Sequence, residues 1–494
     1  MKEKIVIIGG GVAGLAAGIY AQMNHYDSCI YEQNLNVGGE CTAWRRKGYT
    51  IDGSISWLTG TGKDTDINRV WLEVGAFTND SIIFSNEFAV VTMDGKKLYW
   101  YRDINKLRAN LLDISREDAE EIERMVYIID RLKAVEMPAD KPLDLMKPAE
   151  TALFINKFMK CFHCLGNIGG MTMEEYVERF HSKLIREALK SFSFANNLTQ
   201  GFFFTVSAIA SCQAGWPLGG SGGLTHNMLQ RYLKLGGQVF CNKRVGKIIT
   251  EGTGTTGVML EENAFIPADY VIPACDVHVT MKKLLNDQYR DIIFDRYYSE
   301  TQNYRTSSIC QITFGVDCDL SGYPEKSIFI FEPVSLAGEV FNNCIFTHYC
   351  YESTFAPEGK SVIKTGFIVY DYDNWKDMTE EDYRDRKEEI SEVFTNKLFE
   401  YFPETRGKIE MTDITTPLTY ERYCGAYKGS YMAFMLTKTT NRVSHTGRIK
   451  GIGNLYIASQ WLSVLGGLPD TVLSGKFAIQ RLCHDKGRSF AGVE

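Results

Sequence analysis

The sequence predicts an α/β protein whose first forty residues form a βαβ unit. The first observation is a short apolar run, 5–8, which is long enough for a buried parallel strand. The second is the order that follows it: a glycine-rich turn over 9–14, an alanine-rich helical pattern over 15–23 and a second strand-like run at 28–31. Many glycines (44) beside few prolines (12) indicate tight strand–helix turns rather than linkers.

The composition is that of a globular chain long enough for two or three domains. Of 494 residues, 44% are hydrophobic and 23% are charged, and the net charge is −7. These values exclude a disordered chain and a polytopic membrane protein, and the acidic balance argues against a nucleic acid partner. Scattered cysteines without a visible signal peptide favour a cytoplasmic location. The CxxC pair Cys161 and Cys164 lacks the second pair that a zinc site needs, so no metal is expected.

The glycine-rich turn has the spacing of a dinucleotide-binding fingerprint. Gly9 allows a tight turn after the strand, and Gly11 lets the backbone approach a pyrophosphate. Ala13 precedes Gly14, which lets the helix pack closely on the strand. The pyrophosphate then lies at the positive end of the helix. Glu32 closes the second strand near the spacing of an acid that binds a ribose hydroxyl, so NAD or FAD is expected rather than NADP.

The residues after the acid indicate FAD rather than NAD. A second glycine pair, Gly38 and Gly39, follows at once, and a strand-like segment over 48–53 comes next. An NAD-dependent dehydrogenase continues with further βα units at this point. The order found here is typical of flavoproteins of the glutathione reductase type, in which the second glycine pair lets the chain pass close to the cofactor. We therefore predict an FAD-binding Rossmann domain of that type.

With three further segments, the chain resembles the phytoene desaturase, carotenoid isomerase and retinol saturase family of FAD-dependent oxidoreductases. The segments are a glycine turn over 215–224, an Ala-Asp-Tyr-Val-Ile strand and aspartate over 268–276, and 454–475 with its Gly-Gly-Leu-Pro. The resemblance implies that discontinuous segments assemble the FAD-binding domain and that the intervening segments form an α+β substrate domain. The expected FAD-binding segments are 1–75, 205–285 and 425–494, and the expected substrate-domain segments are 76–204 and 286–424.

The resemblance also implies cofactor contacts outside the first βαβ unit. It places Val245 against the adenine side of FAD. It brings a strand and a helix N-terminus, with Gly467 and Leu468, against the flavin. Gln460 stands where relatives often carry an acid, and its amide can hydrogen bond a ribityl or phosphate oxygen.

One departure concerns the residue after the second glycine pair. Many desaturases have arginine at this position, but this chain has Glu40. We expect Arg45 to contact the pyrophosphate instead, with Arg46 as the alternative.

Within the substrate domain we expect an antiparallel sheet with helices on one side. The segments 308–315 and 361–370 have the apolar, β-branched character of strands. The charged, periodic segment 379–402 predicts a surface helix.

Two apolar segments are candidates for the path of the substrate. The segment 191–230 contains no Lys, Arg, Asp or Glu and predicts a buried helix that leads into a glycine turn; a channel wall is a compatible alternative. For 152–170 we expect core packing, and an amphipathic entrance helix at a membrane surface is the alternative. The charge-free segment lacks the run of about 20 apolar residues that a transmembrane helix needs.

Hydride or electron transfer at FAD needs no dedicated nucleophile, and the sequence does not place a catalytic acid or base, so the catalytic residues are unknown. Among the isolated histidines, His226 follows the glycine turn nearest the expected flavin. Four tyrosines, Tyr420, Tyr423, Tyr427 and Tyr431, are expected to line the pocket or to pack in the core. Only one dinucleotide fingerprint is present, so the electron partner is unknown.

The resemblance implies an FAD-dependent oxidoreductase that acts on carbon–carbon double bonds of a small apolar, polyene- or isoprenoid-like substrate. Isomerisation, saturation and desaturation all stay open, with the first two favoured by the Gly-Gly-Leu-Pro segment. Two other classes are alternatives. One is an amine-oxidase-like flavoenzyme acting on a small polar substrate, and the other is a flavin-bearing lipid carrier without turnover. If the substrate is apolar, peripheral contact of the enzyme with a membrane stays open.

Overall fold

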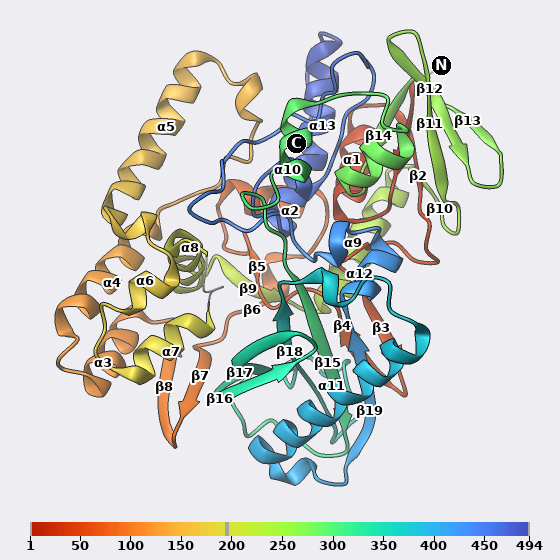
Figure 1. Cartoon of the computed structure of the whole chain (residues 1–494). Helices are drawn as coiled ribbons and strands as arrows, with labels where there is room; N and C mark the ends of the chain where they lie inside the picture. The colour runs from red at the N-terminus through yellow and green to blue at the C-terminus, as the bar shows by residue number, and fades with distance from the viewer. Residues whose placement is uncertain (1, 193–196, 493–494) are drawn as a thin grey trace.

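A small parallel sheet forms the centre of the nucleotide-binding part. The computed structural model describes residues 2–192 and 197–492 (Figure 1). The strand order is β10-β2-β1-β14, and every pairing in it is parallel. Ile5 of β1 lies between Ser28 of β2 and Tyr270 of β14. The strands are β1 (Lys4–Ile8), β2 (Asp27–Tyr31), β10 (Gln238–Phe240) and β14 (Tyr270–Pro273).

Three helices cover one face of this sheet and a small antiparallel sheet covers the other. Helix α1 (Val12–Met23) packs against α9 (Gly220–Lys234) and α13 (Leu468–Asp485). The α1–α13 contact is close because Gly475 has no side chain; a Cβ there would lie 2.5 Å from the Ala13 carbonyl oxygen. The opposite face packs on β11 (Val245–Glu251) and β12 (Gly254–Leu260) through a shared apolar core. This layered arrangement is the predicted Rossmann-type unit.

The larger sheet has the strand order β19-β15-β18-β17-β16-β7-β8. We expected an antiparallel sheet, but β16 and β7 pair in parallel, because β7 and β8 form an early hairpin that joins the edge of the later strands. The expected strands and surface helix are present. The elements are β7 (Glu87–Met93), β8 (Lys96–Tyr101), β15 (Ser308–Val316), β16 (Lys326–Leu336), β17 (Glu339–His348), β18 (Ser361–Val369), α11 (Glu380–Tyr401) and β19 (Ile409–Thr415).

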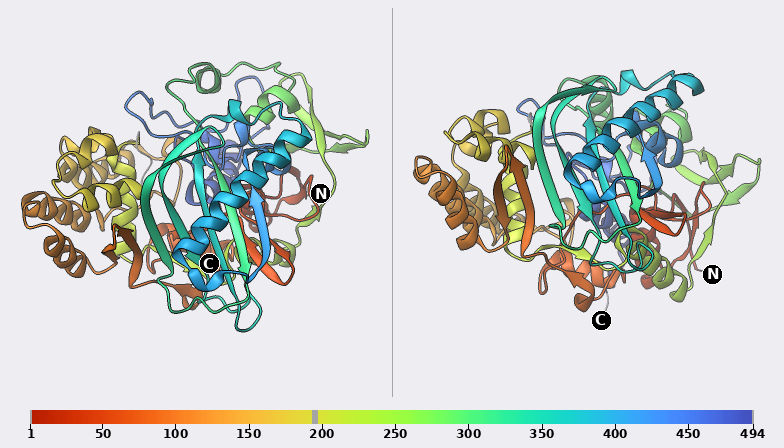
Figure 2. Two further views of the ribbon diagram at one scale, coloured as in Figure 1. Left: turned by 60° about the horizontal axis from the view of Figure 1, so that its bottom comes forward. Right: turned by 90° about the horizontal axis from the view of Figure 1, so that it is seen from below.

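Helix α11 crosses one face of the larger sheet, as the views from below show (Figure 2). It packs there through Ile390, Phe394 and Leu398, which join the buried core beneath the strands. The opposite face of the sheet is therefore free to border a cavity.

Beside β7 and β8, a group of helices forms a separate layer with its own apolar core (Figures 1 and 2). These helices are α3 (Ile104–Ile114), α4 (Ala119–Leu132), α5 (Pro148–Phe162), α6 (Met173–Val177), α7 (Lys183–Ser191) and α8 (Thr199–Ala210). No helix of residues 2–192 and 197–492 combines the length and apolar character needed to span a bilayer.

Short elements connect these layers. They are β3 (Ala43–Arg46), β4 (Tyr49–Asp52), β5 (Leu58–Thr59), α2 (Asp66–Glu73), β6 (Ile82–Ile83), β9 (Ala214–Pro217), β13 (Phe265–Pro267), α10 (Ile292–Ser299) and α12 (Pro417–Cys424). The strands of the larger sheet come from the two ranges expected for the substrate domain, and the domain boundaries themselves stay a prediction.

Candidate cofactor and substrate site

The turn between β1 and α1 has the geometry that its glycines predict. Gly9 has φ of +103°, which favours glycine. A Cβ on Gly14 would lie 2.0 Å from the Gly9 carbonyl oxygen, so only glycine allows the helix to start this close to the strand. Helix α1 begins at Val12. Its N-cap residue, Gly11, has no side chain that could accept hydrogen bonds from the amides of the first turn. The amides of its first turn are therefore open to an anion.

Two further parts of the predicted fingerprint lie beside this turn. The buried Glu32 carboxylate accepts hydrogen bonds from the Gly10 amide at 2.7 Å and from the Asn34 amide at 2.8 Å. The Gly38 amide donates to the Gly10 carbonyl at 2.9 Å, and Gly38 and Gly39 have φ of +130° and +60°. The second glycine pair thus holds its loop directly against the first.

A cavity of about 1590 Å³ opens from these loops and continues between the two sheets. Most of the predicted cofactor-binding residues line it: Gly9, Gly11, Ala13, Glu32, Gly38, Gly39, Val245, Gln460, Gly467 and Leu468. Gly14 lies beneath the turn, where it permits close packing.

Arg45 is not brought to this site. It lies on β3, where its guanidinium donates to the Thr50 hydroxyl at 3.3 Å and to the Thr354 carbonyl at 3.4 Å. Among the described residues, those that line the cavity do not include Arg45. Its neighbour Arg46 forms an ion pair with Asp413 at 3.3 Å. Because β3 pairs with β4 in a separate hairpin, both side chains are held away from the glycine turn.

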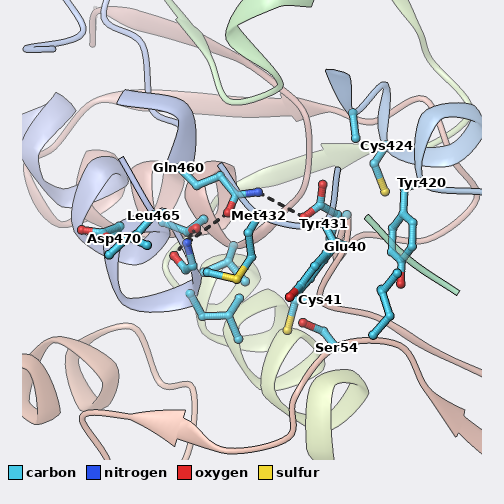
Figure 3. A pocket seen from close by; sticks show the side chains of 18 of the residues that line it. Glu40, Cys41, Ser54, Tyr420, Cys424, Tyr431, Met432, Gln460, Leu465 and Asp470 are labelled. Atoms are coloured by element: carbon cyan, nitrogen blue, oxygen red, sulfur yellow. Dashed lines mark hydrogen bonds between the residues drawn. The ribbon is translucent and has the colours of Figure 1, made fainter. Parts of the chain in front are cut away.

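The amide of Gln460 connects two walls of the cavity (Figure 3). Its nitrogen donates to the Glu40 carboxyl at 3.1 Å, and its oxygen accepts from the Gly467 amide at 3.1 Å. Gly467 is the N-cap of α13, so this amide aligns the start of the helix with the loop after the second glycine pair. Burial raises the pKa of Glu40 to about 8, and the bond from Gln460 opposes this rise. The raised pKa favours the protonated form of this carboxyl at neutral pH.

Two more acids in the cavity wall have raised pKa values. Burial raises the pKa of Asp276 to about 6, although it accepts hydrogen bonds from the Tyr427 and His278 amides at 2.8 and 2.6 Å. Burial raises the pKa of Asp470, in the first turn of α13, to about 7. Sequence reasoning did not assign Asp470 a role, since an acid in a first helical turn is an ordinary feature.

The expected tyrosines Tyr420, Tyr423, Tyr427 and Tyr431 all line the cavity. His226 does not: it is exposed on α9, outside the lining within the described residues. Among those residues, no group of three or more His, Cys, Asp or Glu is placed to hold a metal ion. The side chain of Cys161 lies outside the described part of the chain.

Beyond the glycine loops, part of the cavity wall is apolar. From α8 it receives Phe202, Phe204 and Ala208, and from the larger sheet Ile345 and Ile368. The charge-free segment 191–230 therefore contributes both a buried helix and a channel wall; its residues 193–196 lie outside the described part.

The expectation of core packing for 152–170 is wrong for α5. This helix stands at the edge of the molecule (Figure 1), and the exposed fractions are 70% for Leu153, 52% for Ile155 and 59% for Met159. Phe158 stacks on Phe162 of the same helix, and the Phe162 ring lies 5.0 Å from the Phe204 ring of α8 in a tilted arrangement. The apolar periodicity of this segment could not show that the other face of α5 is exposed.

The residues at the glycine end of the cavity fit the FAD that the sequence implies. A Cβ on Gly11 would find its nearest atom, the Gly38 carbonyl oxygen, at 3.8 Å, so the backbone there is open on the cavity side. Open helix amides suit a diphosphate, and the Glu32 carboxylate suits a ribose hydroxyl. Fold and site together define a dinucleotide-binding flavoprotein.

Comparison with known proteins identifies the family. The model of flavin-containing amine oxidoreductases matches residues 12–483, and the chain belongs to this family. It is thus an FAD-dependent oxidoreductase. Phytoene desaturase (lycopene-forming) of Pseudescherichia vulneris is 23% identical, with 98% of this chain and 99% of the relative covered. Chloroplastic prolycopene isomerase of Daucus carota is 22% identical, with 98% and 80% covered.

Solved structures agree on the fold. An oxidoreductase from Methanosarcina mazei gives a TM-score of 0.60 at 16% identity, with 97% of this chain and 100% of that chain covered. A redesigned putrescine oxidase gives 0.61 at 14% identity, with 98% and 99% covered. The predicted mixed α/β architecture with a Rossmann-type sheet is confirmed.

Proposed function

We propose that this oxidoreductase acts on carbon–carbon double bonds of an apolar, polyene- or isoprenoid-like substrate, by isomerisation, saturation or desaturation. The full-length similarity to two carotenoid enzymes supports this substrate class. The observation that carries the proposal is the continuity of the cavity from the glycine loops to an apolar wall.

Size and lining both support an apolar substrate beside the cofactor. Ordinary small-molecule pockets have volumes of about 300–1,000 Å³, whereas this cavity has about 1590 Å³. The cofactor takes up the part of this volume at the glycine loops. Phenylalanines and isoleucines line part of the remainder, where a hydrocarbon chain is favoured and a small ammonium compound gains little.

FAD, when bound, supplies the electron or hydride transfer. The chain's own residues bind and orient the cofactor and the substrate. The first turn of α1 and the Glu32 carboxylate would hold the nucleotide end, and Gln460 aligns the N-terminus of α13 with the opposite loop. The aromatic side chains Tyr420 and Tyr431, together with Phe202 of α8, exclude water from the space between.

An anaerobic mixing experiment tests this proposal. The reduced holoprotein is mixed with a panel of polyenes, retinoids and unsaturated lipids while the visible absorption of the flavin and the products are followed. Reoxidised flavin with a product that has one fewer double bond supports saturation, and unchanged flavin with an isomerised product supports isomerisation. The oxidised holoprotein, mixed with the same panel, tests desaturation by flavin bleaching.

Two results would contradict the proposal. Rapid oxygen consumption with amines, and no reaction with any polyene, would favour the amine-oxidase-like alternative. Bound lipid that never changes when the flavin is reduced or oxidised would favour a carrier without turnover.

We further propose that α5 contacts a lipid surface and forms the entrance for such a substrate. Its exposed apolar side chains include Leu153 and Met159, and Phe158 of the same helix lines the cavity. An apolar substrate thus passes from lipid to cavity without crossing water.

Flotation with phosphatidylcholine–phosphatidylglycerol vesicles tests this entrance. The double variant Leu153→Ser and Met159→Ser is expected to lose at least half of the vesicle-bound fraction. The matched control is Ile292→Ser, which removes an equally exposed apolar side chain from α10, where Ile292 is 76% exposed. Equal flotation of the double variant and the control would refute the proposal.

A further inference from the structure

One face of β18 brings a lysine to the cavity wall. Side chains alternate between the faces of a strand. Ile363 and Phe367 belong to the core beneath α11, so Lys364, Gly366 and Ile368 face the other way, and all three line the cavity.

The Lys364 side chain is only 8% exposed, and its ammonium is incompletely paired. Its nitrogen donates to the Asp52 carbonyl at 3.1 Å and lies 5.6 Å from the centre of the Tyr349 ring. Within residues 2–192 and 197–492, no carboxylate oxygen lies within 4.0 Å of this nitrogen. An ammonium has three hydrogens to donate, and the Asp52 carbonyl accepts one of them.

The acid whose carbonyl Lys364 binds is committed to other donors. One Asp52 carboxylate oxygen accepts from the Ser54 and Ile55 amides, each at 3.1 Å, and from the Ser221 hydroxyl at 2.6 Å. The other accepts from the Ser221 amide at 2.7 Å. Asp52 therefore fixes the loop before the cavity and attracts Lys364 only from a distance.

Thr347 completes a pair of donors on the same face. It stands directly opposite Lys364 in the pairing of β17 with β18, so the two side chains are cross-strand neighbours. Thr347 is buried and lines the cavity as well. An ammonium and a hydroxyl side by side match the two oxygens of a carboxylate.

The surroundings explain why an anion is favoured there. Burial lowers the pKa of Lys364, with a partial offset from Asp52, because a charge without a close partner is costly in an apolar wall. A bound carboxylate supplies the missing partner.

We propose that the substrate is an unsaturated carboxylic acid whose carboxylate is bound by the Lys364 ammonium and the Thr347 hydroxyl. This inference rests on the proposed function and narrows its substrate class. The apolar chain of the acid then extends along Ile345 and Ile368 toward α8.

Paired retinoid probes test the inference. Retinoate and retinol share one polyene chain and differ in the charged end. Dissociation constants are measured for the oxidised holoprotein by equilibrium dialysis at pH 7. The wild type is expected to bind retinoate about 10- to 100-fold more tightly than retinol, as a charge-assisted hydrogen bond allows. Lys364→Met is expected to remove that preference by weakening retinoate alone, and Lys364→Arg to retain most of it.

Lys326 offers a matched control on the same face of the sheet. Its buried ammonium donates to the Ser56 carbonyl at 2.9 Å and lies 4.2 Å from the centre of the Phe88 ring, outside the cavity lining within the described residues. Lys326→Met is expected to change the retinoate preference less than threefold. Flavin content and melting temperature report whether each variant folds.

The outcomes separate this inference from the proposed function. Equal binding of retinoate and retinol by the wild type, or an unchanged preference in Lys364→Met, would overturn the carboxylate site and leave the polyene substrate class intact. Binding of neither retinoid would overturn both. If Lys364→Met loses its flavin, displacement from the wild type decides: palmitate is expected to displace retinoate and hexadecanol is not, and equal displacement would overturn the inference.

Discussion

Substitutions at two glycines of the first turn distinguish a loss of FAD affinity from a loss of folding stability. Gly11 has φ of −71° and ψ of −177°, which alanine adopts without strain. A Cβ there would have its nearest neighbour at 3.8 Å, an ordinary contact. Gly11→Ala is therefore expected to leave the apoprotein as stable as the wild type or about 0.4–1 kcal/mol more stable.

The same methyl group projects to the open side that a diphosphate must approach. Losing one hydrogen bond to a charged group costs about 1.5–3 kcal/mol. The affinity of Gly11→Ala for FAD is thus expected to fall roughly 10- to 150-fold. Fluorescence titration of the apoprotein with FAD measures this change, and thermal unfolding of the apoprotein measures stability.

Gly14→Ala is the contrasting variant. Its Cβ would lie 2.0 Å from the Gly9 carbonyl oxygen, so the turn must shift, and overpacking of this kind costs about 1–3 kcal/mol or more. Both stability and FAD binding are expected to fall. A Gly11→Ala protein that binds FAD within twofold of wild type, or whose apoprotein is destabilised as much as Gly14→Ala, would refute the reasoning.

Two further predictions concern the Gln460 bridge. Burial raises the pKa of Glu40 from its ordinary value of 4.5 to about 8, so the folded chain keeps a proton that the unfolded chain releases. The contribution of Glu40 to stability is therefore largest below pH 4.5 and is lost as the pH rises to about 8, by at most about 5 kcal/mol. Glu40→Gln is expected to flatten this fall in urea unfolding of the apoprotein, and an unchanged pH dependence would contradict it. Gln460→Leu leaves the Glu40 carboxyl and the Gly467 amide without their partner and is expected to cost about 1–3 kcal/mol; urea unfolding with no loss of stability would show that the bridge is not formed.

The sequence predicted the local features that depend on chain neighbours. The tight turn at Gly9 and close packing at Gly14 follow from spacing within one turn, and two strands of the larger sheet, β15 and β18, follow from apolar runs. Arg45 could not be placed correctly, because its position depends on the β3–β4 hairpin rather than on its distance from the glycine pair along the chain.

Features that depend on pairing between separate strands could not be predicted from the sequence. The position of Lys364 beside Thr347 arises from strand register, and the two residues are far enough apart in sequence that no local pattern joins them. A signal for Lys364 did exist, since a lysine within the apolar run Ser361–Val369 is unusual for a buried strand. The exposure of α5 likewise depends on what lies opposite the helix.

The central claim is that one cavity holds both the flavin and an apolar unsaturated ligand. The measurement that tests it most directly is a titration of the oxidised holoprotein with retinol while the visible absorption of the flavin is followed. We expect a saturable change with one equivalent of ligand, and its loss in Thr205→Trp, which fills the cavity from α8. A flavin spectrum that retinol leaves unchanged, or a change that Thr205→Trp does not affect, would contradict it.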